Sequence, residues 1–403
     1  MQRRHDIDAL RALAFALLIL YHWCMLYVAD WGWHIKSPYL AEWLQWPMLL
    51  VNRWRMDLVF LVSGLAVNFL LRDTGAGRFL ALRSWRLLLP LVFGMAVVVP
   101  VQPYVEGVSN GLVEPGFGSF LLRYFSGAAW PEGAFAGWEH SMTWNHLWYL
   151  AYLWTYTVVL AALLPLLRSR AGQWLRTRFT GLRGAWLVLL PALPLALATL
   201  LLQPHFEETG DLVNDWYRHA IYFTTFLYGY WIATDAGLWA EFARLRRRTL
   251  SLALGLFAFY AALVALVPDD IPGWLQGSVW LLRNLYIWAA LCAILGWSRV
   301  LLDRPFRWLP WANEAVYPWY VLHQSLIVAL AYWLLPLGLG PVLEPVAVLA
   351  GTVAGCWFLH ALLIRRVALL RPLFGLKRAA TPLARAPSPS PACLPPGAPR
   401  AAG

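Results

Sequence analysis

Charged side chains are scarce in this sequence. Only 13% of the 403 residues are Asp, Glu, Lys or Arg, whereas 60% are hydrophobic and the mean hydropathy is +0.55. A soluble domain carries about a quarter charged residues. Cysteine is also rare, and the four cysteines form no CxxC pair, which argues against a disulfide framework and a zinc site. The chain contains no internal repeat and no soluble stretch long enough to fold alone. Most of its surface is therefore expected to face lipid.

Long apolar runs occupy most of the chain. A helix needs about 20 apolar residues to cross a bilayer, and ten segments qualify: 9–29, 47–71, 87–104, 143–167, 184–203, 216–235, 249–267, 275–296, 314–335 and 342–364. The first segment has the basic start of a signal peptide, but it is too long and bulky and lacks an A-x-A cleavage site. The 26 tryptophans suit membrane interfaces. These features predict an all-α, polytopic integral membrane protein with about ten transmembrane helices.

Basic residues are distributed unevenly between the loops. If the N-terminus is cytosolic, 25 of the 32 Lys and Arg residues fall on the cytosolic side, at 3–4, 72–86, 168–183, 244–248, 299–307 and 365–400. The opposite loops are acidic, with Glu or Asp in the segments 106–139, 207–215 and 269–270. This bias predicts that both ends are cytosolic. It also explains the net charge of +11 without a nucleic-acid partner.

The composition divides the chain into two parts. Residues 1–370 are predicted to form one transmembrane domain, and 371–403 a cytosolic tail. From residue 379 onward the tail is rich in Pro, Ala and Ser, which predicts disorder. The longest stretch outside the predicted helices, 105–142, contains Trp and Gly and is predicted to be a loop that partly re-enters the membrane.

The first apolar segment carries two polar groups, Arg11 and His22. Eleven helical steps return to within about 20° of the starting direction, so both side chains share one face, about 16 Å apart along the axis. Ionisable groups within a membrane usually face a bundle interior or a wet cavity. The plainer alternative is that Arg11 reaches the lipid headgroups and His22 binds a neighbouring helix.

The second and third segments add charged candidates. Arg55 and Asp57 lie two positions apart, so they do not face each other and each needs another partner. The Ser63-Gly64 pair suits close helix packing. Arg83 and Arg86 are three apart at the cytosolic side, where two guanidinium groups can grip a phosphate or diphosphate. The alternative for this pair is an ordinary positive-inside signal.

Two further histidines lie near or within the predicted membrane. His146 is placed at the outer interface between tryptophans, and His323 lies within the segment 314–335. The plainer alternative for His146 is a hydrated histidine in an interfacial aromatic belt. A single buried histidine is more often structural than catalytic. Because His22 and His323 occur in one bundle, they suggest a shared polar cavity.

The order of these motifs resembles a known family. An R-x10-H spacing on the first helix, "RMDLVFLVSG" on the second, an RxxR pair entering the third and "HLWYL" on the fourth are similar to the membrane-bound acyltransferase-3 family. The opening "IDALR" and the late "YVLH" look closest to its glucan biosynthesis protein C branch. The resemblance covers residues 1 to about 370.

The resemblance implies acyl transfer in a bacterial inner membrane. It implies that an acetyl or succinyl group moves from cytosolic acyl-CoA to a hydroxyl of a glycan or other acceptor outside, with His22 and Arg11 catalytic and Arg83 and Arg86 binding the donor. No permanently bound cofactor or metal is expected. Arg55, Asp57, His146 and His323 are candidate supporting residues. We expect Arg86 to matter more for the donor than Arg83, which is placed nearer the water.

Other functions suit the same pattern. Ten helices with buried His and Arg would suit a transporter or flippase of a glycan or lipid-linked intermediate, although no inverted repeat is evident. A non-catalytic scaffold of a glycan-assembly complex is a third hypothesis. For an acyltransferase, the sequence leaves open whether His22 acts as a general base or carries the acyl group covalently.

Overall fold

The computed structural model describes residues 4–267 and 271–377. Its helices run in chain order as α1 His5–Met25, α2 Gln45–Arg72, α3 Ala76–Phe93, α4 Val101–Ser109, α5 Phe117–Ser126, α6 Trp148–Arg168, α7 Arg170–Thr180, α8 Ala185–Leu202, α9 Trp216–Ile232, α10 Ala236–Leu266, α11 Gly273–Leu301, α12 Leu309–Leu334, α13 Gly340–Phe358 and α14 Leu370–Leu373. Within the described ranges there is no β-strand, only an isolated bridge between Val28 and Ala41. The prediction of an all-α membrane protein is confirmed.

Nine helical stretches in the described part of the chain are long and apolar enough to cross a membrane. They cover nine of the ten predicted segments. The remaining segment, 216–235, forms α9, whose 17 residues reach only the lower end of the spanning range. The largest change of boundary concerns α10, which begins at Ala236 rather than near 249 and carries the arginines at 244–248 within its first half.

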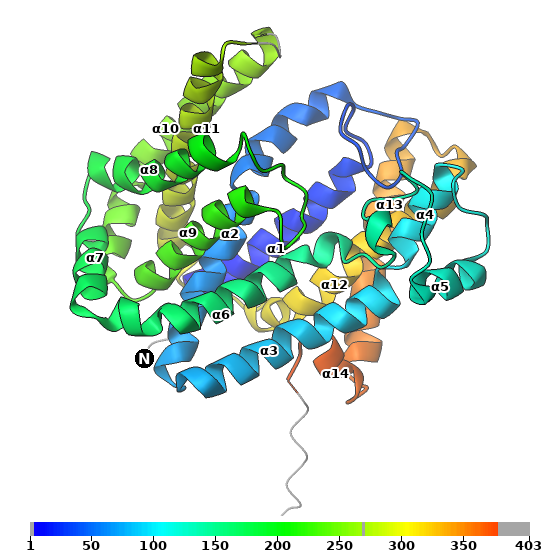
Figure 1. Cartoon of the computed structure of the whole chain (residues 1–403), viewed down its shortest axis with the longest axis horizontal. Helices are drawn as coiled ribbons and strands as arrows, with labels where there is room; N and C mark the ends of the chain where they lie inside the picture. The colour runs from blue at the N-terminus through cyan, green and yellow to red at the C-terminus, as the bar shows by residue number, and fades with distance from the viewer. Residues whose placement is uncertain (1–3, 268–270, 378–403) are drawn as a thin grey trace, which may run out of the picture.

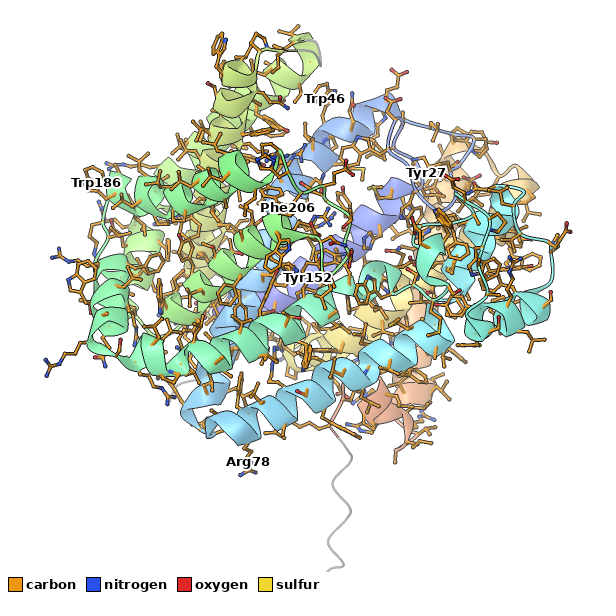
Figure 2. All side chains as sticks on the ribbon, viewed as in Figure 1. Tyr27, Trp46, Arg78, Tyr152, Trp186 and Phe206 are labelled. Carbon is orange, nitrogen blue, oxygen red and sulfur yellow. The ribbon has the colours of Figure 1, made fainter. Side chains whose placement is uncertain are left out.

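The helices pack as a bundle around α1, α2 and α12 (Figure 1). α10 and α11 form a long antiparallel pair that projects from the bundle at the top of the view. Only 17% of the most apolar part of α10 is buried, and Phe259 and Leu266 are exposed. The exposed Trp186 likewise points outward from α8 (Figure 2). These apolar side chains need no protein partner because lipid replaces water around the bundle.

The close contact between α2 and α9 depends on glycine. A Cβ added to Gly64 would overlap the carbonyl oxygen of Phe226, and one added to Gly229 would overlap the carbonyl oxygen of Leu61. The two backbones therefore touch at both positions, as small residues allow in membrane helices. This contact agrees with the packing interpretation of the Ser63-Gly64 pair.

The stretch between α3 and α6 folds over one end of the bundle. Its short helices, α4 and α5, enclose a small apolar core that includes Phe120, Tyr124 and Trp130. The Tyr124 hydroxyl accepts a hydrogen bond from the Thr143 backbone nitrogen at 3.1 Å and donates to the Thr143 carbonyl oxygen at 3.2 Å. Burial raises the pKa of Tyr124 to about 12, so it remains a donor at neutral pH. These contacts fix the backbone just before His146.

The beginning of the predicted tail packs against the bundle. α14 is followed by the buried Phe374, whose ring lies 5.2 Å from that of Phe93. Gly375 adopts a left-handed conformation (φ +72°) against the ring of Tyr317. Residues 378–403, where disorder was predicted, lie outside the described residues, and so do Asp269 and Asp270.

Candidate active site

Four buried or partly buried histidines lie near one end of the bundle: His22, His34, His146 and His323. His22 lies in the last turn of α1 and His323 lies in the middle of α12. The Nδ1 atom of His22 is 2.8 Å from the Nε2 atom of His323, and the two rings are within 15° of parallel. The ring of His146 is 5.2 Å from that of His323. The shared polar site inferred from His22 and His323 is therefore a direct contact between them.

Hydrogen bonds fix the orientation of His323. Its Nδ1 atom lies 3.0 Å from the Trp319 carbonyl oxygen and 2.7 Å from the Tyr320 carbonyl oxygen. Both partners are acceptors, so Nδ1 must carry the proton. In neutral His323 the Nε2 atom is consequently an acceptor, and it receives the Nδ1 proton of His22. That leaves the Nε2 atom of His22 with its lone pair, and no residue in the described part of the chain hydrogen-bonds to it.

His146 has a different environment from the one predicted. It is only 5% exposed, and its Nε2 atom lies 3.2 Å from the Val321 carbonyl oxygen. Its Nδ1 atom accepts a hydrogen bond from the Gln102 amide at 3.1 Å. The plainer alternative of a hydrated histidine at the interface therefore does not hold, because the 101–147 stretch folds over the ring. With both ring nitrogens engaged, His146 supports the site but has no free nitrogen with which to accept a proton.

A polar network continues from His146 to the edge of the bundle. Gln102 also donates to the Ser325 hydroxyl at 2.7 Å, and the Gln324 amide donates to its side-chain oxygen at 3.0 Å. Gln324 also lies 2.9 Å from Nε2 of His34, whose Nδ1 atom is 2.5 Å from Glu106. Sequence reasoning did not single out these partners, although Gln324 and Ser325 directly follow His323.

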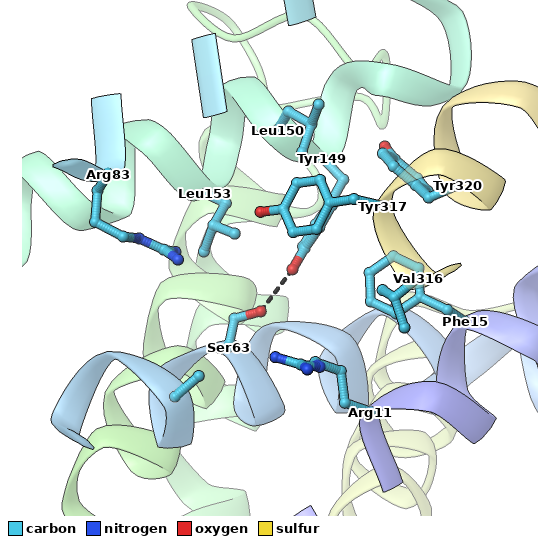
Figure 3. Close-up of a pocket in the computed structure, with 11 residues that line it drawn as sticks. Arg11, Phe15, Ser63, Arg83, Tyr149, Leu150, Leu153, Val316, Tyr317 and Tyr320 are labelled. Carbon is cyan, nitrogen blue, oxygen red and sulfur yellow. Dashed lines mark hydrogen bonds between the residues drawn. The ribbon is translucent and has the colours of Figure 1, made fainter. Parts of the chain in front are cut away.

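A second site lies between α1, α2, α3, α6 and α12, toward the predicted cytosolic side. It is a small cavity of about 40 Å³, and the side chains of Arg11 and Arg83 point into it (Figure 3). Arg11 donates a hydrogen bond to the Asn313 side chain at 2.7 Å. Two nitrogens of Arg83, Nε and Nη2, are buried without a hydrogen-bond partner among the described residues. Ser63 and Tyr149 also line the cavity, and their hydroxyl oxygens are 2.5 Å apart.

The solvent exposure of the two arginines in the RxxR motif is the reverse of what we expected. Arg83 is half-buried and lines the cavity, whereas Arg86 is exposed. Arg86 donates to the Gly375 carbonyl oxygen at 3.3 Å and lies 5.8 Å from the Tyr317 ring. The expectation that Arg83 lies nearer the water is wrong, because α3 begins at Ala76 and its helical phase turns Arg83 toward the bundle. Arg83 thus joins Arg11 from the other side of the cavity.

Tyr320 separates the arginine cavity from the histidines. Its ring lines the cavity, and its hydroxyl donates to the His146 carbonyl oxygen at 2.5 Å. Its own carbonyl oxygen accepts from His323, three residues along the same helix. The structure therefore places Arg11 with Arg83 and His22 with His323, on opposite sides of one aromatic residue. Arg11 does not contact His22, and its predicted catalytic role stays a prediction.

Arg55 and Asp57 belong to a third site. The Arg55 guanidinium carbon lies 3.4 Å from the centre of the Tyr21 ring, adjacent to His22. Asp57 is 3% exposed, and it lines a third, polar cavity together with Arg55 and Arg283. No hydrogen bond or ion pair joins Arg55 to Asp57, and Oδ1 of Asp57 has no hydrogen-bond partner among the described residues. The prediction that each has a partner elsewhere stays a prediction for Asp57. No group of three or more His, Cys, Asp or Glu side chains with metal-binding geometry occurs within residues 4–267 and 271–377.

Comparison with known protein families shows which family the chain belongs to. Residues 4–361 match the family described as an acyltransferase domain, which covers nearly the whole chain. The chain belongs to the acyltransferase-3 family. It is a membrane acyltransferase, and the family resemblance inferred from the motifs is confirmed. The glucan biosynthesis protein C branch stays a prediction. No curated protein and no solved structure matches the chain.

Proposed function

We propose that this acyltransferase moves an acyl group, such as acetyl or succinyl, from cytosolic acyl-CoA to a hydroxyl of a glycan or similar acceptor on the opposite side of a bacterial inner membrane. The observation that carries the proposal is the free Nε2 atom of His22. A hydroxyl is a poor nucleophile at neutral pH, and a histidine with an available lone pair can accept its proton. Such general-base catalysis contributes about 10²–10⁴-fold to a reaction rate.

In the proposed reaction, Nε2 of His22 removes the acceptor's hydroxyl proton as the oxygen attacks the thioester carbonyl carbon. The tetrahedral intermediate then breaks its carbon–sulfur bond. The CoA sulfur leaves with the electron pair and takes the proton back from His22, which gives the ester and free CoA thiol. Throughout, the Nδ1 proton of His22 remains directed at His323, which holds the imidazole in position. His323 is thus a positioning residue.

The donor would enter through the arginine cavity. Guanidinium groups match the oxygens of a diphosphate, and the free N–H groups of Arg83 face the cavity beside Arg11. Arg86, which is exposed and lies 5.8 Å from the ring of the cavity residue Tyr317, would meet the nucleotide phosphates first. The thioester would then pass Tyr320 to reach His22. Arg11 and His22, eleven residues apart on α1, would mark the two ends of this path.

A transfer assay tests the proposal. Full-length protein in lipid nanodiscs is supplied with acyl-CoA radiolabelled in the acyl group, and free CoA thiol and labelled product are followed over time. We expect CoA release that depends on the protein and rises when a hydroxyl acceptor is added. A transporter or a scaffold would release no CoA, so absence of release with every acyl-CoA offered would contradict the proposal.

A further inference from the structure

The third site is a polar cavity of about 190 Å³ between α2, α6, α9, α11 and the loop before α9. One ordered water needs about 10–15 Å³ by the same measure, so the space exceeds that of a few waters. Its lining is unusually charged for the interior of a membrane bundle. The charged members are Arg53, Arg55, Arg218, Arg283, Asp57 and Glu208. By the basic-residue bias this end of α2 faces away from the cytosol, opposite to the arginine cavity.

Two of the four arginines already have partners. Arg218 lies 2.8 Å from Glu208 and 3.8 Å from Asp215. Burial raises the pKa of Glu208, but Arg218 outweighs burial and holds that pKa below its ordinary value, so the carboxylate is ionised at neutral pH. Arg283 donates to Gln203 and Tyr217.

The other two arginines keep unused donors. The Nε atom of Arg53, and the Nε and Nη1 atoms of Arg55, are buried without hydrogen-bond partners in the part of the chain that the structure describes. The lining as a whole contains four basic and two acidic side chains, so basic groups outnumber acidic ones by two. Buried guanidinium N–H groups without acceptors cost free energy. An anionic ligand would satisfy them.

Aromatic rings form the other side of the cavity. Trp148 and Tyr222 line this side, and their rings stack 5.8 Å apart with planes 29° from parallel. Tyr222 also stacks on Phe60 at 4.8 Å, so the rings form a rigid aromatic border of the cavity. Aromatic rings pack against the apolar faces of sugars, and the hydroxyl groups of the sugar remain available for hydrogen bonds. One oxygen of the buried Asp57, Oδ1, has no partner among the described residues and is available to accept a hydrogen bond from a hydroxyl group. The cavity thus offers guanidinium donors, a carboxyl acceptor and an aromatic border.

Arg55 links this cavity to the histidines. It lines the cavity, and its guanidinium lies over the ring of Tyr21, the residue before His22. The Tyr21 ring in turn lies 6.1 Å from the His22 ring. A ligand held at Arg55 would therefore lie beside the proposed base.

We infer that this cavity binds the acceptor, and that the acceptor is an anionic saccharide whose carboxylate or phosphate group contacts Arg53 and Arg55. The inference rests on the proposed function, because it assigns the acceptor side of that reaction. Arg53 and Arg55 provide the charge and free donors, Trp148 and Tyr222 border the space for the sugar, and Asp57 accepts a hydrogen bond from a sugar hydroxyl.

Matched sugars provide the test. Binding of methyl glucuronide, methyl glucoside 6-phosphate and uncharged methyl glucoside to the full-length protein in nanodiscs is measured by calorimetry, without acyl-CoA. We expect at least one anionic sugar to bind about tenfold or more tightly than the uncharged one, as charge-assisted hydrogen bonds would provide. The carboxylate and phosphate probes separate the two anion types. The preference should be lost in Arg53→Gln and Arg55→Lys.

Arg123→Gln is the matched control, since Arg123 is exposed on α5 and binds the Ala129 carbonyl oxygen away from the cavity. It should keep the preference. Equal or absent binding of all three sugars by the wild-type protein would overturn the inference, and so would a preference that survives both substitutions. If binding follows the expectation but no CoA is released in the transfer assay, the proposed function fails while the anion site stands. The Arg variants could instead change the preference between acetyl-CoA and succinyl-CoA and leave sugar binding unchanged. In that case the cavity binds the acyl donor, and the inference is overturned.

Discussion

His22 and His323 are joined by a hydrogen bond of 2.8 Å between Nδ1 and Nε2, although 300 residues of sequence separate them. The carbonyl oxygens of α12 hold the proton of His323 on the far nitrogen, so His323 can only accept from His22. His323 thereby orients His22, and the Nε2 atom of His22 remains free. This relationship leads to the first two predictions.

His22→Ala should abolish acyl transfer while the protein still inserts and folds. A general base contributes to the transition state more than to stability, so we expect turnover to fall by about 10²–10⁴-fold with little change in acyl-CoA binding. Single-turnover kinetics with labelled acyl-CoA measures the loss. Turnover close to that of the wild type would show that His22 is not the base.

His323 should act through its acceptor atom. His323→Gln keeps a side-chain oxygen that can accept from His22, whereas His323→Leu keeps only the bulk, so we expect Gln to retain about tenfold more turnover than Leu. The KM for acyl-CoA should be unchanged in both variants, since the arginine cavity is separate. If both substitutions were equally harmful, packing rather than hydrogen bonding would explain the role of His323.

Arg83→Lys should raise the KM for acyl-CoA more than Arg86→Lys does. Arg83 presents free N–H groups to the cavity, and lysine supplies charge without the forked geometry. We expect an increase of about tenfold or more for Arg83→Lys and a smaller one for Arg86→Lys, with the KM for the acceptor unchanged in each case. Steady-state kinetics measures both constants.

Arg78→Lys is the control for this pair, because Arg78 lies on α3 and points away from the bundle (Figure 2). It should behave like the wild type. If all three lysine variants had wild-type constants, Arg83 and Arg86 would be only topological signals, for which charge and not shape counts.

Gly64→Ala and Gly229→Ala should each destabilise the bundle. The added methyl group would overlap a backbone carbonyl of the facing helix, which cannot rotate away as a side chain can. Overpacking of this kind typically costs about 1–3 kcal/mol, so we expect a lower Tm in detergent. Gly255→Ala is the control, since nothing lies within 4 Å of its added Cβ. An unchanged Tm in the first two variants would mean that α2 and α9 separate readily.

The topology should follow the positive-inside bias. Reporter fusions at residues 130 and 210 should be external, and fusions at 175 and 245 cytosolic, because the basic clusters at 168–183 and 244–248 resist translocation. Alkaline phosphatase and fluorescent-protein fusions report the two sides. A cytosolic result at 210 would contradict the orientation, and with it the assignment of the donor and acceptor sides.

Much of the architecture follows from local sequence properties. The apolar runs, the positions of the helices and the all-α class can be read from composition, because each membrane helix satisfies its own backbone hydrogen bonds and needs only about 20 apolar residues. The helical period also places Arg11 and His22 on one face of α1. For the same reason the spacing of Arg55 and Asp57 was sufficient to predict that the two side chains do not face each other.

The composition of each site was decided only by the tertiary structure. The sequence predicted that His22 and His323 share a cavity, but not which nitrogen each would use, since that depends on carbonyl oxygens exposed one turn away on α12. It misplaced Arg83 relative to Arg86, because the rotation of α3 against its neighbours is set by packing. Period and hydropathy are properties of single helices, whereas a site depends on how helices pack, and that is fixed by contacts between residues far apart in the chain.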